Sequence, residues 1–491
     1  MESRVLLHAR EYEMREGGKI DKLQRGAFHL SPLVGWMNDP NGFSCYDGSY
    51  HLFYQYYPYK CEWGPMHWGH AISRDLLHWE YLPAALAPDQ PYDLDGCFSG
   101  SAITVDSKHL LIYTGVVKEY EENGKFKYRQ RQSIAIGDGR DYLKYEKNPV
   151  IDEKVLPEGA NPYEFRDPKI WQKEDGSFRC VTGNLKKDGK GQILLFESEN
   201  AFDWKFERVL LENNGQFGKM WECPDFFKMG DSGVLIMSPQ DMKAQGDEYP
   251  NGNFALCLIG EVNDETDEFV PKTSQTIDYG MDFYAPQTML TEDGRRIMIG
   301  WMQNWDTIQV RQENGKWFGQ MSLPRELEIR NNRLLQRPVR ELLTMRHNEV
   351  ICKNVCIFGK CCLDQIKGRC VDLVVEVACA DKEGNGKFEL RFAQGIGLFC
   401  SLSYDFSDRK LTMDRRFSGS RRAAVHSQSC RIENENEALR FRLILDRYSA
   451  EVFVGDGEQT MSMVLFTDLS ADGISFRSDQ KMMMNLEKYD L

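Results

Sequence analysis

HLFYQY at residues 51–56 is a short run of aromatic and apolar residues, and similar runs recur along much of the chain. LLIY at 110–113 and QILLF at 192–196 are two more, and turns rich in Gly, Asp and Asn separate them. Long helical periodicity is lacking between about residues 29 and 335, so the pattern predicts many antiparallel strands in a barrel, sandwich or propeller. Radial repetition protects strand edges at this size better than one sheet does. We therefore favour a propeller, and the pattern leaves the number of blades open.

A change of pattern after the basic stretch at residues 325–346 predicts a second domain. FELRF at 388–392 alternates polar and apolar residues, as does much of 439–454, and glycine-rich turns recur at 384–386 and 455–457. Such alternation is typical of sheets with one buried face, and it suits a β-sandwich. The expected division is an amphipathic helical extension on the surface (1–28), a propeller (29–337), and a linker with a sandwich (338–491).

Composition narrows the class of partner. The 491 residues carry a formal net charge of −14, so no broad basic field is available for nucleic acid or an anionic membrane, and an uncharged ligand fits better. Residues 1–22 contain no uninterrupted apolar stretch, and no later segment approaches the roughly 20 apolar residues that span a bilayer. We expect a cytoplasmic protein with 14 reduced cysteines. The oligomeric state cannot be read from the sequence.

Two clusters are given no function. Four cysteines fall within residues 352–362 but lack paired Cys-x-x-Cys spacing, so we expect buried thiols and no metal site. Arginine pairs at 415–416 and 421–422 suggest either a phosphate or nucleic-acid patch or a solvated turn. In an acidic protein we favour the solvated turn.

Three acidic motifs carry the chemistry expected of the first domain. They are WMNDPNG at 36–42, RDP at 166–168 and WECPD at 221–225. Asn, Pro and Gly dominate turns, so we expect the first motif to be a tight turn through which no strand continues. Taken alone, it would be an ordinary structural turn. All three are expected to place a carboxylate at a strand end terminated by proline, where different blades converge on a common mouth.

Cleavage of a glycosidic bond requires such a set of carboxyl groups. One attacks the anomeric carbon, and another protonates the leaving oxygen. Asp39, flanked by amides, is the natural nucleophile, whereas the apolar neighbours of Glu222 would raise its pKa and make it the natural proton donor. Arg166 would keep Asp167 ionised, and a purely structural ion pair between these two is the alternative.

Further motifs extend the pattern to a resemblance with a known family. They are FYQY at 53–56, WGH at 68–70, FSGS at 98–101, FRDPK at 165–169 and DFYAPQ at 282–287. Together with the acidic motifs they resemble, in order and spacing over residues 29–340, the motif set of glycoside hydrolase family 32. Those enzymes are invertases, fructanases and sucrose-6-phosphate hydrolases. EVFV at 451–454 is similar to the family's carboxy-terminal sandwich.

The resemblance implies an all-β fold: a five-bladed β-propeller, with a funnel-shaped site on its axis, followed by a β-sandwich. Asp39 would be the nucleophile, Glu222 the acid/base, and Asp167 the transition-state stabiliser that binds fructose hydroxyls. Ten further residues would line the fructosyl subsite: Trp36, Asn38, Gln55, Trp63, Phe98, Ser99, Arg166, Cys223, Tyr284 and Trp301. For Trp63 and Phe98 the alternative is packing in the propeller core.

The expected reaction is retaining hydrolysis of terminal β-D-fructofuranosyl residues from sucrose, sucrose 6-phosphate or a short fructo-oligosaccharide. No metal or organic cofactor is implied, since two carboxyl groups and water complete the reaction. A fructosyltransferase is the main alternative, because the chemistry is shared until water or a sugar hydroxyl resolves the intermediate. A non-catalytic sugar-binding propeller would keep the aromatic residues and lose at least one carboxylate.

The sequence does not specify which group is attached to the fructosyl unit and leaves in the reaction. Tyr57 stands where many relatives carry Asn, which puts the shape of the loop leading to Trp63 in doubt. A phosphorylated glucose would need a nearby cation. The candidates are Lys60, Lys186, Lys187 and Arg311, and each is otherwise a solvated loop charge.

Overall fold

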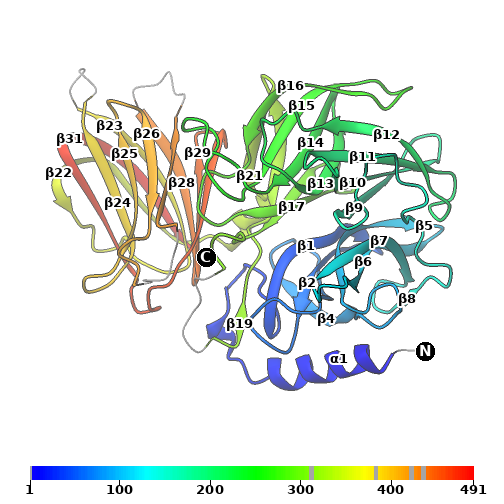
Figure 1. Cartoon of the computed structure of the whole chain (residues 1–491). Helices are drawn as coiled ribbons and strands as arrows, with labels where there is room; N and C mark the ends of the chain where they lie inside the picture. Colours follow the sequence, from blue (N-terminus) through cyan, green and yellow to red (C-terminus); the bar gives the residue numbers. More distant parts are fainter. Residues whose placement is uncertain (1–2, 309–314, 381–384, 420–424, 433–437) are drawn as a thin grey trace.

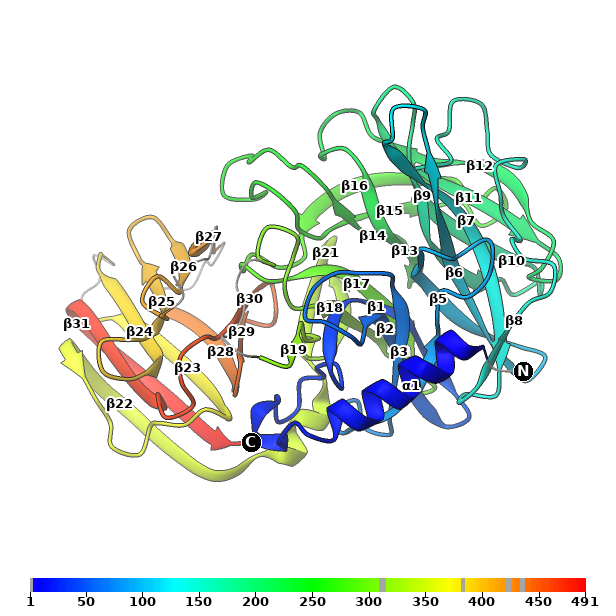
Figure 2. The ribbon, with the colours of Figure 1, turned by 60° about the horizontal axis from the view of Figure 1, so that its bottom comes forward.

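The computed structural model describes residues 3–308, 315–380, 385–419, 425–432 and 438–491. Strands dominate, as the sequence predicts, and they form a five-bladed propeller with a sandwich beside it (Figures 1 and 2). The predicted fold class is confirmed. In the described ranges, every helix is too short or too polar to serve as a membrane span.

The first two blades are built from consecutive antiparallel strands. Blade one contains β1 (Gly35–Tyr46), β2 (Ser49–Tyr57), β3 (His67–Ser73) and β4 (Trp79–Leu86). Blade two contains β5 (Gly96–Val105), β6 (Lys108–Tyr120), β7 (Phe126–Gly137) and β8 (Tyr142–Lys144). Apolar residues on the two faces of each blade pack against the neighbouring blades.

The other three blades repeat the plan. Blade three contains β9 (Phe165–Gln172), β10 (Phe178–Leu185), β11 (Gly191–Ser198) and β12 (Lys205–Glu212). Blade four contains β13 (Trp221–Met229), β14 (Ser232–Pro239), β15 (Leu256–Val262) and β16 (Phe269–Thr276). Blade five contains β17 (Tyr284–Leu290), β18 (Arg296–Trp301), β20 (Arg325–Arg330) and β21 (Arg333–Pro338).

The innermost strands β1, β5, β9, β13 and β17 form a closed ring around the propeller axis. Each contacts the next, and β17 contacts β1. The short strand β19 (Trp317–Phe318) pairs in parallel with the start of β1, so a segment between β18 and β20 of blade five completes blade one. A ring of this kind leaves few exposed strand edges.

Every innermost strand is irregular. In β1 the register shifts between Met37 and Pro40 and a second time between Asn41 and Ser44, and in β9 it shifts opposite Val181 and Gly183. In β5, β13 and β17 it shifts within the sequence motif that each of these strands carries. These are β-bulges, which re-aim side chains. β1 runs through the whole Asn-Asp-Pro motif, so the expectation of a tight turn that ends a strand is wrong. The prolines fit inside strands because a bulge leaves a ladder N–H position unpaired.

The sandwich begins after the 3-10 turn η2 (Arg340–Met345) and is one ten-stranded sheet that folds over a single apolar core. The long last strand, β31, pairs with three others along its length: β22, β23 and β24. The ten strands are β22 (His347–Cys361), β23 (Val371–Cys379), β24 (Lys387–Gln394), β25 (Cys400–Asp405), β26 (Lys410–Asp414), β27 (Ser427–Arg431), β28 (Ala438–Asp446), β29 (Ser449–Val454), β30 (Gln459–Val464) and β31 (Gly473–Asp490).

Helix α1 (Arg4–Gly17) lies within the expected amino-terminal extension and docks on blade one (Figure 1). Ser3 caps its first turn, and a 3-10 turn, η1 (Lys22–Gln24), follows. Arg10 donates to the carbonyl of Ala84 in β4, and the buried carboxyl of Glu13 accepts from the Ala84 N–H. Burial raises the pKa of Glu13 to about 7. The helix is therefore more closely integrated with the propeller than a surface extension would be.

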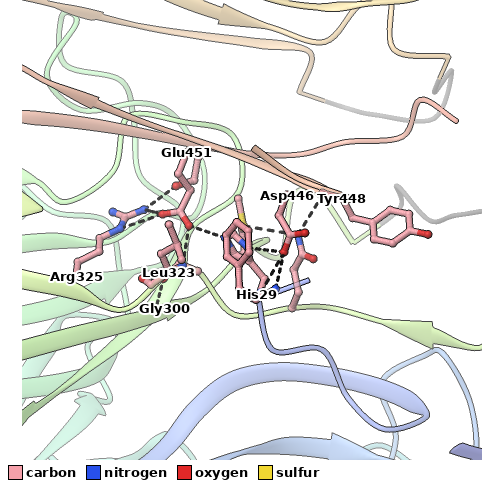
Figure 3. Close-up of polar contacts among 12 residues, drawn as sticks. His29, Gly300, Leu323, Arg325, Asp446, Tyr448 and Glu451 are labelled. Carbon is pink, nitrogen blue, oxygen red and sulfur yellow. Dashed lines mark hydrogen bonds and ion pairs between the residues drawn. The ribbon is translucent and has the colours of Figure 1, made fainter. Parts of the chain in front are cut away.

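A buried ionic network joins the propeller to the sandwich (Figure 3). His29 bonds Asp446 through Nδ1 at 3.0 Å and Glu451 through Nε2 at 2.9 Å. Arg325 of blade five contacts Glu451 at 2.6 Å and Asp278 at 2.9 Å. All five side chains are fully buried, so each charge depends on its partners for stabilisation.

A second interdomain ion pair corrects an expectation. Arg415, expected in a solvated turn, is buried and pairs with Asp282 just before β17. Arg416 does lie at the surface and pairs with Asp414. Arg421 and Arg422 lie outside the described residues.

We predict that His29 makes stability depend on pH. Burial alone would lower the pKa of the imidazole, but hydrogen bonds to Asp446 and Glu451 raise it to about 9. Because this value exceeds the 6.5 of an ordinary histidine, the stabilisation is complete below pH 6.5 and is lost as pH rises through 9. The shift corresponds to roughly 3 kcal/mol.

Urea unfolding measured from pH 6.5 to above pH 9 checks this. The free energy of unfolding of the wild type should fall over this range, while His29→Gln should be less stable at pH 6.5 and lack most of the fall. Equal pH dependence in the two proteins would show that His29 is not charged in the folded state.

Candidate active site

Asp39 lies in the bulge of β1 and is held by donors from two blades. Its Oδ2 accepts from the Ser99 hydroxyl at 2.6 Å, and its Oδ1 accepts from the Asn38 amide at 3.1 Å. The Trp36 indole N–H donates to the side-chain oxygen Oδ1 of Asn38 at 2.7 Å and so fixes the orientation of that amide. Burial and the nearby charge of Glu222 raise the pKa of Asp39, and the bonds from Ser99 and Asn38 oppose this increase. Asp39 is thus a buried carboxyl group with one defined orientation.

Cys223 joins Asp39 to Asp167. Its backbone N–H donates to Asp167 Oδ2 at 2.9 Å, and its Sγ lies 3.5 Å from Asp39 Oδ2 and 3.6 Å from Asp167 Oδ2. Burial and the surrounding carboxylates raise the pKa of the thiol well above its usual range, so it remains a protonated donor. Three blades therefore place side chains at one point.

Asp167 has left-handed backbone geometry, with φ of 64°, as does Cys223 at 49°. Such conformations cost energy in residues other than glycine and persist where the surrounding structure enforces them. Burial raises the pKa of Asp167 to about 7, and Glu222 and Asp39 add to the rise against the opposing charge of Arg166. The neighbouring charge of Arg166 opposes this rise and favours the ionised carboxylate, as the sequence leads us to expect.

Arg166 instead makes its close contacts with glutamates. Its Nε donates to Glu222 Oε1 at 3.0 Å, and its Nη1 contacts Glu164 at 2.6 Å. The Tyr284 hydroxyl donates to Glu222 Oε2 at 2.7 Å. The side chain of Glu222 is 12% exposed, so it is held from two sides and still reaches solvent.

An apolar cluster surrounds the carboxyl groups. It brings together Trp36, Cys223, Tyr284 and Trp301, with Phe98 packed at its edge. Trp36 and Trp301 are fully buried, and their rings lie 6.1 Å apart. The indole N–H of Trp301 has no partner in the described part of the chain. This environment weakens competition from water and strengthens the polar contacts inside it.

The remaining predicted subsite residues have different surroundings. Gln55 is buried, and its amide donates to the Cys97 carbonyl at 3.0 Å, where it anchors the start of β5. Trp63 is 38% exposed, and its ring lies 5.9 Å from that of Phe98. For Trp63, this exposure favours a binding surface over the core packing that was the alternative. Tyr57 packs at the edge of the apolar cluster.

None of the described cations that were candidates for binding a phosphate shows a prepared phosphate site. Lys60 pairs with Glu62 at 3.1 Å and Lys186 with Glu212 at 3.0 Å. Lys187 is exposed, and Arg311 lies outside the described residues.

Several residues that hold the site residues in place are not predicted from the sequence. The Thr114 hydroxyl accepts from the Asp167 N–H at 3.0 Å, and Gln130 accepts from Arg166 at 3.4 Å. Lys169 bridges Asp225 at 2.9 Å and the carbonyl of Thr288, which links blades three, four and five. Lys169 and Asp225 belong to the FRDPK and WECPD motifs, so their opposite charges could have indicated from the sequence that they form a pair.

Comparisons with known proteins agree with this geometry. Residues 29–338 match the glycosyl hydrolases family 32 N-terminal domain, and residues 341–490 match the family 32 C-terminal domain. A sucrose-6-phosphate hydrolase of Zymomonas mobilis is 39% identical over 454 residues, which are 89% of this chain and 85% of that protein. A raffinose invertase of Escherichia coli is 37% identical over 449 residues, covering 91% and 90%.

Solved structures show the same similarity. A Bombyx mori GH32 beta-fructofuranosidase has a TM-score of 0.84 at 35% identity, covering 99% of this chain and 97% of that one. A mutant of that enzyme in complex with sucrose has a TM-score of 0.85 at 34% identity, covering 100% and 99%. Family matches over nearly the whole chain, with the carboxyl groups assembled on the propeller axis, establish that this protein belongs to glycoside hydrolase family 32.

Proposed function

We propose that this protein is a β-fructofuranosidase that hydrolyses sucrose or sucrose 6-phosphate with retention of configuration. The observation that carries the proposal is the convergence of three carboxyl groups: Asp39 of β1 and Asp167 of β9 meet at Cys223 of β13, and Glu222 of β13 is held by Arg166, the neighbour of Asp167. The sucrose-6-phosphate hydrolase and beta-fructofuranosidase relatives support the same substrate class. A terminal fructosyl unit would occupy the funnel next to these carboxyl groups.

In the first half of the reaction, the Asp39 carboxylate attacks C2 of the fructosyl unit and forms an ester. The bond from C2 to the bridging oxygen breaks, and protonated Glu222 gives its proton to that oxygen. Ser99 and Asn38 support the proposal because they hold both Asp39 oxygens in place and so restrict the direction of attack.

In the second half, ionised Glu222 takes a proton from water, the water oxygen bonds to C2, and the ester to Asp39 breaks. Asp167 accepts hydrogen bonds from fructose hydroxyls and stabilises the positive charge that develops at C2. Arg166 and Tyr284 position Glu222 for both proton transfers. No step requires a metal or an organic cofactor.

The identity of the leaving group separates the candidate substrates. Relatives of similar identity include sucrose-6-phosphate hydrolases and a raffinose invertase, so similarity alone does not choose among them. The deciding experiment compares release of glucose or glucose 6-phosphate from sucrose, sucrose 6-phosphate and a short fructo-oligosaccharide. We place the reaction in the cytoplasm, where a small imported saccharide is the substrate.

The same experiment tests the transfer alternative. A hydrolase releases fructose in equal amount to the glucose product, whereas a fructosyltransferase releases less free fructose and accumulates longer saccharides. Failure to cleave all three substrates would refute the enzymatic proposal and favour the non-catalytic sugar-binding alternative.

We predict that Asp39→Asn keeps the fold and sucrose binding but lowers kcat by at least about a thousandfold, because the amide cannot form the ester intermediate. Steady-state kinetics and calorimetric titration with sucrose measure the two effects. A folded variant with near wild-type turnover would remove Asp39 from its proposed role.

We predict that Glu222→Gln lowers kcat for sucrose by roughly 10²–10⁴-fold, because the amide cannot protonate the leaving oxygen. Glu164→Gln is the matched control, since Glu164 contacts the same guanidinium of Arg166 and is 38% exposed. Its loss should stay within about tenfold, as for a partly exposed ion pair. Similar losses in the two variants would mean that the charge around Arg166, rather than proton donation, matters.

A further inference from the structure

The hairpin formed by β6 and β7 has two faces of opposite character. Cross-strand partners place Tyr120 opposite Phe126 and Lys118 opposite Tyr128. The residues between them alternate to the other face, where Glu119 lies opposite Lys127. One face of the outer hairpin is therefore aromatic, and the reverse face is charged.

The aromatic face continues into the candidate active site. Ring centroids lie 5.8 Å apart for Tyr120 and Phe126, 5.2 Å for Phe126 and Tyr128, 6.0 Å for Tyr128 and Phe98, and 5.9 Å for Phe98 and Trp63. We call these five residues the aromatic ridge. Its inner end is Phe98, which packs against the apolar cluster of the site, together with Trp63, whose ring contacts Phe98.

The base of the same hairpin contacts the catalytic machinery. Thr114 in β6 bonds the backbone of Asp167, and Gln130 in β7 bonds Arg166. Gln130 is two residues from Tyr128 on the same strand face. The outer part of the ridge, Tyr120, Phe126 and Tyr128, therefore leads outward along the same pair of strands that contacts Asp167 and Arg166.

Three rings of the ridge are exposed in a way that core packing does not explain. Tyr120 is 71% exposed, Phe126 is 45% exposed, and Trp63 is 38% exposed. Exposed aromatic residues that adjoin one another indicate a binding surface, whereas single ones need no explanation. The ridge adjoins the apolar cluster of the site through Phe98, so a molecule bound at the carboxyl groups can extend along it.

The rings are held in place before any ligand arrives. Lys118 Nζ lies 5.2 Å from the Phe126 centroid and 5.8 Å from that of Tyr128, and it pairs with Asp95 at 3.3 Å. On the reverse face, two bonds of 2.9 Å join Arg129 to Glu119. A surface ordered in this way loses little conformational entropy on binding.

Resting on the proposed function, we propose that the aromatic ridge binds the outer sugar units of an oligosaccharide leaving group. A sugar ring has an apolar C–H face and a polar rim, which match an aromatic surface with Lys118 and Asp95 beside it. Sucrose has one sugar unit outside the fructosyl subsite, and that unit reaches the inner end of the ridge. The next unit of a trisaccharide reaches Phe126 and Tyr120.

The test compares kcat/KM for sucrose, raffinose and 1-kestose in the wild type and in Tyr120→Ala/Phe126→Ala. We expect the sucrose value to be nearly unchanged and the value for at least one trisaccharide to fall about tenfold, the loss of two ring contacts. Phe358→Ala is the matched control, because Phe358 is 67% exposed on β22 of the sandwich. Lys127→Ala tests the charged face of the same hairpin. Both controls should leave the ratio of trisaccharide to sucrose activity unchanged.

Each other outcome has a defined meaning. Unchanged trisaccharide-to-sucrose ratios for both trisaccharides overturn the ridge proposal and leave the proposed function intact. A wild type that cleaves neither sucrose nor the trisaccharides refutes the proposed function itself. A change in oligomeric state by light scattering, with unchanged ratios, would make the ridge a contact between copies and also overturns the proposal. If the double variant fails to fold, Tyr120→Leu and Phe126→Leu keep an apolar side chain, remove the ring and decide the same comparison.

Discussion

The bulges in the innermost strands are the constraint on which the site depends. In β1, β9, β13 and β17 the irregular segment includes a proline, and in β9, β13 and β17 the residue before it, Asp167, Cys223 or Ala285, has positive φ. A regular strand would alternate these side chains between the two faces of a blade. The bulge turns them toward the axis instead, and the strain is borne by blades packed on both sides. Proline suits these positions because no ladder hydrogen bond is lost there.

Closure of the ring and attachment of the sandwich support this arrangement. Trp36, which orients Asn38, pairs through its backbone with Phe318 of β19, so the strand that closes the propeller also borders the site. Glu451 of the sandwich accepts from the Leu323 N–H, just before β20, and from His29, just before β1. The buried charges therefore fasten the second domain to the segments where the first and last blades meet. Breaking one partner would leave an uncompensated charge, which is far costlier than replacing the pair.

The sequence predicted the all-β architecture, the two domains and the residues that gather around Asp39, because alternation and ordered motifs are local signals. It misplaced the Asn-Asp-Pro motif as a turn, since proline and asparagine are equally at home in turns and in bulges. It also misjudged Arg415 and the main partners of Arg166, because long-range ion pairs leave no local pattern. The bonding of Thr114 and Gln130 depends on how β9 packs against blade two, which alternation alone does not specify.

The central claim is that the β1 bulge aims Asp39 at C2 of a bound fructosyl unit. The most direct measurement is rapid acid quenching of the enzyme during turnover of sucrose, followed by peptide mass spectrometry. The account predicts that the peptide containing Asp39 carries the added mass of one fructosyl unit, and that Asp39→Asn abolishes this adduct. An adduct on the peptide containing Asp167 or Glu222, or active turnover that yields α-fructofuranose as the first product, would contradict it.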